Sequence, residues 1–163
     1  MNSLPPYTYI PGKTPHPISD PAGHMYGTSD AIEDDHKSMF DRAVELFNNG
    51  YYWEAHEAWE QVWMAHNKKG PQADFIKALI KLSACGVKCL EGNRTGAERH
   101  LRRSGELLGL SHAAVDSIDT FGVSIAHLLQ QVSNLETKLP IQDSEVDPGP
   151  VQPLLGIIPM SDG

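Results

Sequence analysis

The sequence predicts an all-α protein, a compact bundle of about five helices built from two tandem helical hairpins, with extended proline-rich N- and C-terminal arms. Apolar residues recur at helical spacing through the middle of the chain, and no alternating pattern typical of strands competes with them. Prolines crowd both ends, where they prevent long helices. We therefore expect an arm over residues 1–28, a helical domain over 29–139 and a second arm over 140–163.

The first hairpin is predicted between the end of the N-terminal arm and the segment "NKKGP". Ser29 is a suitable N-cap for its first helix, acidic residues follow in the first turns, and Gly50 provides a stop. Its second helix is expected from about Tyr51 to His66, with Trp59 near the centre of the buried stripe.

The second hairpin begins at Pro71, which suits the first turn of a helix that we expect to end near Leu90. A fourth helix is predicted over about 95–108, and a short helical turn over 112–118. The last helix follows Ser124, an N-cap ahead of a periodic apolar run.

An internal resemblance supports the tandem arrangement. Gly50 and Ala55 recur as Gly92 and Ala97, so both pairs are offset by 42 positions. The repeat predicts that the second and fourth helices occupy equivalent places in the two hairpins.

Length, charge and hydropathy narrow the class of protein. A chain of 163 residues with 40% hydrophobic content suits one domain, and its net charge of -8 makes nucleic acid an improbable partner. No apolar run has the length of a membrane helix and the first residues lack the pattern of a secretory signal, so we expect no membrane association and a cytoplasmic location. The apolar stretch "PLLGIIPM" near the C-terminus predicts that this arm covers the body or a partner.

The most informative stretch is "HEAWE", His56 to Glu60. His56 and Glu60 lie one turn apart on one flank of the predicted helix, as paired zinc ligands do, whereas Glu57 is expected to point toward solvent. Applying the 42-residue offset places Glu98 and Arg102 on the matching flank of the fourth helix. If the second and fourth helices pack side by side, His56 with Glu98 and Glu60 with Arg102 would form a polar network that needs no metal.

Three interpretations of this polar cluster remain open: a hydrogen-bonded network, a metal or catalytic site, and a partner-binding surface. The cluster comprises His56, Glu57, Glu60, Glu98 and Arg102. If it holds a divalent metal, the expected ligands are the residues His56, Glu60, Glu98 and His24, the last delivered by the N-terminal arm.

The core from about residue 43 to 108 resembles the all-helical family of domain of unknown function 309. The matching stretches are "LFNNGYYWEAHEAWEQVW" and "DFIKALIKLSACGVKCLEGNRTGAERHLRRSGELL". The resemblance implies a compact helical fold and directs attention to six positions: His56, Glu57, Glu60, Trp63, Asn93 and Gly96. It implies no activity.

Two functions from different classes are compatible with these patterns. The first is a non-enzymatic scaffold that binds a protein partner, or self-associates into a homo-oligomer, through its arms. The alternative is a metal-dependent, hydrolase-like enzyme using His56 and Glu60. Neither the nucleotide-binding nor the acyl-serine motifs occur in the sequence. The sequence therefore leaves open whether the protein is an enzyme.

Overall fold

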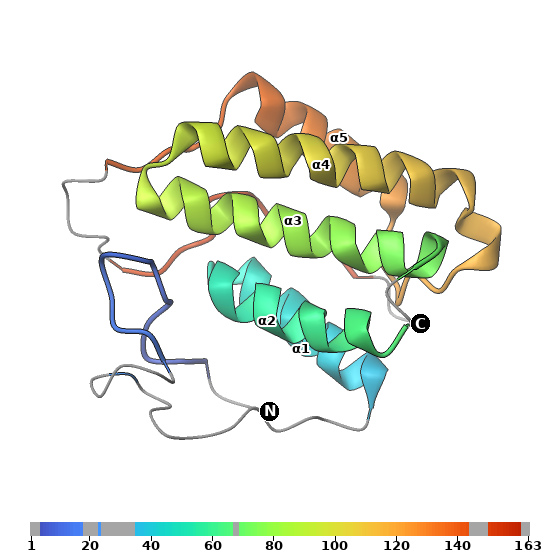
Figure 1. Cartoon of the computed structure of the whole chain (residues 1–163), viewed down its shortest axis with the longest axis horizontal. Coiled ribbons are helices and arrows are strands. Elements are labelled where there is room, and N and C mark those ends of the chain that lie inside the picture. Colours follow the sequence, from blue (N-terminus) through green and yellow to red (C-terminus); the bar gives the residue numbers. More distant parts are fainter. Residues whose placement is uncertain (1–3, 18–22, 24–34, 67–68, 144–149, 161–163) are drawn as a thin grey trace.

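The computed structural model describes residues 4–17, 23, 35–66, 69–143 and 150–160, and it confirms the all-α fold (Figure 1). Within these residues five α-helices form a bundle, with one short 3-10 turn and no strand beyond a single bridge between Val123 and Met160. The elements are α1 (His36–Asn48), α2 (Tyr52–Met64), α3 (Pro71–Glu91), α4 (Arg94–Ala113), η1 (Val115–Ser117) and α5 (Ile125–Thr137).

Local capping fixes the helix ends. Among the described residues α1 begins at His36, where the Asp35 side chain accepts a hydrogen bond from the Lys37 amide and caps the helix. Ser29, the predicted N-cap of the first helix, lies outside the described residues. Ser124 caps α5 as expected, while α4 continues to Ala113, beyond the predicted end.

The helices stack in the order α1, α2, α3, α4, α5, so that α3 lies between α2 and α4 (Figure 1). The second and fourth helices therefore do not pack side by side, which was the condition for the polar network considered from the sequence. Short turns make α1 and α2 one antiparallel pair and α3 and α4 another. The two hairpins then meet through the helices that are adjacent in sequence, α2 and α3.

An aromatic cluster occupies the core between the hairpins. Trp59 is fully buried, with its ring centroid 5.9 Å from that of Phe40 and 6.0 Å from that of Phe47. Phe40 also stacks on Phe75 of α3 and on Phe121 in the loop before α5. The predicted position of Trp59 at the centre of the buried stripe is confirmed.

The described part of the N-terminal arm is attached to α2 by a buried carboxylate. Glu54 accepts hydrogen bonds from the Thr8 hydroxyl at 2.7 Å and from the Tyr9 amide at 2.9 Å. Burial raises the pKa of the Glu54 carboxyl, and these hydrogen bonds partly oppose that rise. The rings of Tyr9 and His16 pack edge-on against Trp53 beside this contact.

The C-terminal arm is held by polar side chains of the first hairpin. The Tyr52 hydroxyl accepts hydrogen bonds from the amides of Leu154 and Leu155, and Asn48 both donates to and accepts from the backbone of Ile158. The side chains of Leu155 and Ile158 are 2% and 1% exposed. The apolar stretch predicted to cover the body or a partner thus packs on its own chain.

None of the helices in the described part of the chain combines the length and the apolar character that crossing a membrane requires.

Candidate functional site

Three side chains of α2 converge on its partly exposed face. His56 Nε2 lies 3.0 Å from Glu60 Oε1, and His56 Nδ1 lies 3.4 Å from Glu57 Oε1. Each of the three side chains offers one possible ligand atom, an imidazole nitrogen or a carboxylate oxygen. These three atoms lie within 4.8 Å of one another. The side chains are 25%, 39% and 34% exposed for His56, Glu57 and Glu60, so the group is accessible from solvent without being fully hydrated.

The position of Glu57 differs from the expectation that it points away from the imidazole. Adjacent helical residues are about 100° apart around the axis, but a glutamate has three side-chain torsions and can bend back along the surface. Here its carboxylate approaches Nδ1 of His56, the nitrogen that Glu60 does not contact. The imidazole is consequently flanked by a carboxylate on each ring nitrogen.

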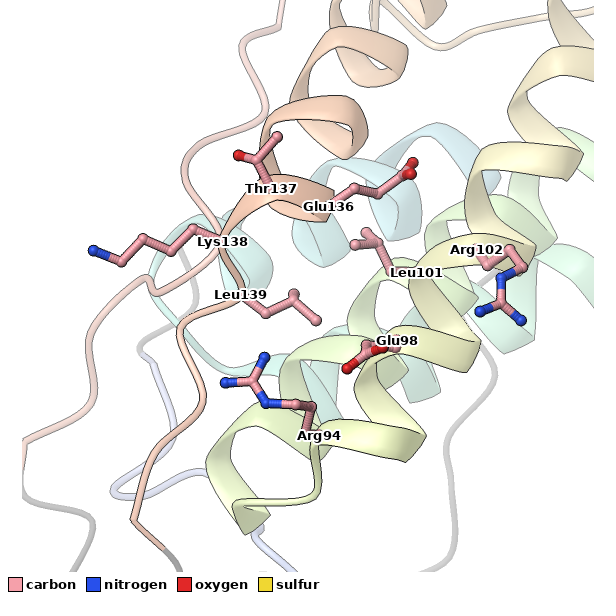
Figure 2. Close-up of a pocket in the computed structure, with 8 residues that line it drawn as sticks. All are labelled: Arg94, Glu98, Leu101, Arg102, Glu136, Thr137, Lys138 and Leu139. Carbon is pink, nitrogen blue, oxygen red and sulfur yellow. The ribbon is translucent and has the colours of Figure 1, made fainter.

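Other residues predicted for this cluster lie elsewhere. Glu98 and Arg102 are exposed on α4 and line a pocket shared with the end of α5 (Figure 2). Since α3 separates α2 from α4, the predicted pairs of His56 with Glu98 and of Glu60 with Arg102 do not form. His24 lies outside the described residues. Of the tentative metal ligands, the structure brings His56 and Glu60 together and adds Glu57.

Basic residues of α3 border the cluster. Lys77, Lys81 and Lys88 share one stripe of this helix, and all three are half-buried although the periodic pattern places them opposite the apolar face. The Lys77 ammonium lies 5.0 Å from the centroid of a Trp63 ring, a cation–π contact between α3 and α2. Burial, followed by the positive charges of Lys77 and Arg103, lowers the pKa of Lys81, while the Glu60 carboxylate opposes this shift.

His100 on α4 is a titratable residue that the structure places near the cluster and that the sequence pattern did not assign to it. Burial lowers its pKa to about 4, and the nearby positive charges of Lys81, Lys88, His56 and Arg99 act in the same direction. Once α4 is known to pack on α3, the spacing of Gly96 and His100 would have placed this imidazole on the shared face. The sequence alone does not say which helices are neighbours, so it did not place His100 near the α2 group.

The lowered pKa of His100 predicts that the protein loses stability under mild acid. Between pH 6.5 and about 4 the unfolded chain binds a proton at this position that the folded chain does not, so the free energy of unfolding falls as the pH falls through this range. With solvent screening of a half-buried group, we expect this residue to account for about 1–2 kcal/mol. Chemical denaturation at pH 7 and pH 4.5 should show a smaller loss for His100→Gln than for the parent.

A matched control is available on the same helix. His112 is exposed in the last turn of α4, so His112→Gln should retain the parental difference between the two pH values. Equal acid sensitivity in His100→Gln and the parent would contradict the prediction.

The donor set of the α2 group suits a divalent cation. Imidazole nitrogen and carboxylate oxygen together are ligands for zinc, manganese and iron(II), and two carboxylates offset the charge of such an ion. Without a metal the same side chains can act as a local hydrogen-bonding group, with His56 donating to Glu60. The arrangement therefore offers either a three-ligand metal site or a surface polar cluster.

The fold and this site define a class: a two-hairpin, all-helical domain with a histidine–glutamate group on its second helix. Residues 40–100 match the family described as "Domain of unknown function (DUF309)". The match over this segment confirms the resemblance seen in the sequence. The segment contains the whole α2 group as well as His100. Comparison with curated proteins gave no match.

Proposed function

We propose that this protein binds a divalent transition-metal ion through His56, Glu57 and Glu60. The observation that carries the proposal is the convergence of three ligand atoms, one from each side chain, within 4.8 Å. All three residues lie on two successive turns of one helix, so folding of α2 alone brings them together. A neutral imidazole and two carboxylates form the type of ligand set found in metal sites that keep positions for water or substrate.

Such a site is compatible with hydrolase-like chemistry. A metal held by three protein ligands can lower the pKa of a bound water and supply a nucleophile near neutral pH. The ligands are accessible to solvent, so water or a substrate would reach a metal held there. We therefore propose metal binding first, and a hydrolytic reaction would depend on the bound metal.

The second candidate, a non-enzymatic scaffold, has weaker support. Self-association through the C-terminal arm would use its apolar residues, but Leu155 and Ile158 are buried against the same chain. Of the large apolar side chains in this arm, Ile157 is exposed, at 58%, so an arm-mediated scaffold would have little apolar surface to use.

Thermal melts test the metal proposal directly. At a free ion concentration 100-fold above the dissociation constant, binding stabilises a folded protein by about 2.7 kcal/mol. For a protein of this size, we expect zinc, manganese or iron(II) to raise the melting temperature by roughly 5–10 °C. His56→Ala should abolish this rise, and the parental rise should shrink at lower pH because protons compete with metal for the imidazole nitrogen.

His127→Ala provides the matched control, because this histidine is exposed on α5 and lies outside the α2 group. It should retain the parental response to metal. Elemental analysis of the purified parent and of His56→Ala measures the same property without heating. A parent that contains no metal and melts at the same temperature with all three ions would exclude the proposal and favour the polar-cluster interpretation.

A further inference from the structure

A pocket of about 260 Å³ lies between the first half of α4 and the end of α5, whereas the α2 group lies on a helix that packs on α3 (Figure 2). Its lining residues are Arg94, Glu98, Leu101, Arg102, Glu136, Thr137, Lys138 and Leu139. None of them belongs to the α2 group. The pocket is therefore a separate candidate site, independent of metal binding by His56.

The two walls of the pocket carry opposite charge. The α4 wall presents two cations and one anion, Arg94, Arg102 and Glu98, and so has a net positive charge. The α5 wall presents Glu136, while the Lys138 ammonium extends away from the pocket (Figure 2). The helix dipoles add to this difference in charge. Arg94 is the first residue of α4, where the dipole is positive, and the α5 wall is the C-terminal turn of its helix, where the dipole is negative.

The charged groups that line this pocket are not neutralised by one another. Among the residues that the structure describes, no ion pair includes Arg94, Glu98, Arg102 or Glu136. Neighbouring helical pairs on the same wall, such as Glu98 with Arg102, have the spacing for an ion pair but do not make one. Both signs of charge thus remain available to a ligand.

Between the charged rims the pocket has an apolar floor. Leu101 and Leu139 are 2% and 8% exposed, and their side chains point toward the space between Arg94 and Glu136 (Figure 2). A cationic rim, an anionic rim and an aliphatic floor together favour a ligand with a carboxylate, an ammonium and a short aliphatic chain. The volume is just below that of typical drug-sized sites, which limits the ligand to a small molecule.

We propose that this pocket binds a free, zwitterionic α-amino acid with an aliphatic side chain. Arg94 receives the carboxylate, Glu136 receives the ammonium group, and Leu101 and Leu139 contact the side chain. A simple anion would leave the Glu136 carboxylate without a partner, and a simple cation would leave the Arg94 guanidinium without one.

Isothermal titration calorimetry with three probes tests the charge requirement. L-leucine carries both charges, 4-methylpentanoate lacks the ammonium group, and 3-methylbutylamine lacks the carboxylate. Because each lost ion pair at an exposed rim is worth up to about 1 kcal/mol, we expect each half-ligand to bind the full-length protein about fivefold more weakly than leucine. Equal affinity for all three probes, or no detectable binding of leucine, would overturn the proposal.

Variants of the two rims test the assignment of each charge. Arg94→Gln should weaken leucine binding while leaving 3-methylbutylamine unaffected, and Glu136→Gln should weaken leucine while leaving 4-methylpentanoate unaffected. Arg103→Gln is the control, because Arg103 is exposed on α4, lies outside the pocket and pairs with Glu106. A loss of leucine binding in the control equal to that in Arg94→Gln would assign the effect to net charge and contradict the proposed site. Both rim variants keep the α2 group, so this test is separate from that of metal binding.

Discussion

Replacing Trp59 by alanine is expected to lower the free energy of unfolding by about 3–5 kcal/mol, the usual range for truncating a buried tryptophan. The side chain is fully buried, and its ring packs against Phe40 and Phe47 of α1. Removing it leaves a cavity where the first hairpin is held together. Its indole N–H has no hydrogen-bond partner among the described residues, so the loss should come from packing alone.

Guanidinium denaturation followed by circular dichroism measures this effect. Trp63→Ala is the matched control, because it removes the same side chain from a half-buried position on the same helix. We expect its effect to be less than half that of Trp59→Ala. Equal destabilisation by the two variants would contradict the central role of Trp59.

Tyr52→Phe is expected to destabilise the protein by about 2–4 kcal/mol and to release the C-terminal arm. The hydroxyl accepts hydrogen bonds from the amides of Leu154 and Leu155 at 2.7 Å and 2.9 Å, and both donors lose their partner in the variant. Each buried donor left without a partner costs about 1–3 kcal/mol. The ring itself remains in place, because it packs directly over Gly86 of α3, where an added Cβ would lie 2.4 Å from it.

Hydrogen exchange separates release of the arm from general destabilisation. Hydrogen exchange of the amides in 150–160 should accelerate in Tyr52→Phe more than that of amides in α3. Tyr51→Phe is the control, since Tyr51 is also buried and its hydroxyl makes no hydrogen bond with the described residues that would be lost. Unchanged exchange in the arm would show that other contacts, such as those of Asn48, suffice to hold it.

The helices with the clearest local signals were predicted well from sequence. Pro71 at the start of α3 and Ser124 ahead of α5 each act over a single turn, so neighbouring residues suffice to recognise them. For the start of the first helix the sequence offers two acceptable N-caps, Ser29, which lies outside the described residues, and Asp35, which caps α1. The spacing alone does not distinguish between two suitable caps six positions apart.

The candidate sites show the same contrast between residues brought together within one helix and residues brought together by packing of different helices. His56 and Glu60 share a helix, so their proximity follows from the 3.6-residue repeat. His100 and Lys81 lie on different helices, and they come near each other only because α3 packs on α4. The 42-residue offset correctly indicated two hairpins but says nothing of which helices face each other when those hairpins dock.

The sequence by itself determined the helical content, the position of Trp59 in the core and the local His56–Glu60 pair, because each depends on periodicity or capping within a few turns. Tertiary structure decided that α3 separates α2 from α4, and so placed Glu98 and Arg102 in a pocket with α5. It also decided that the C-terminal arm covers its own chain. These outcomes depend on which apolar faces meet, and that choice is made by the packing of the whole core.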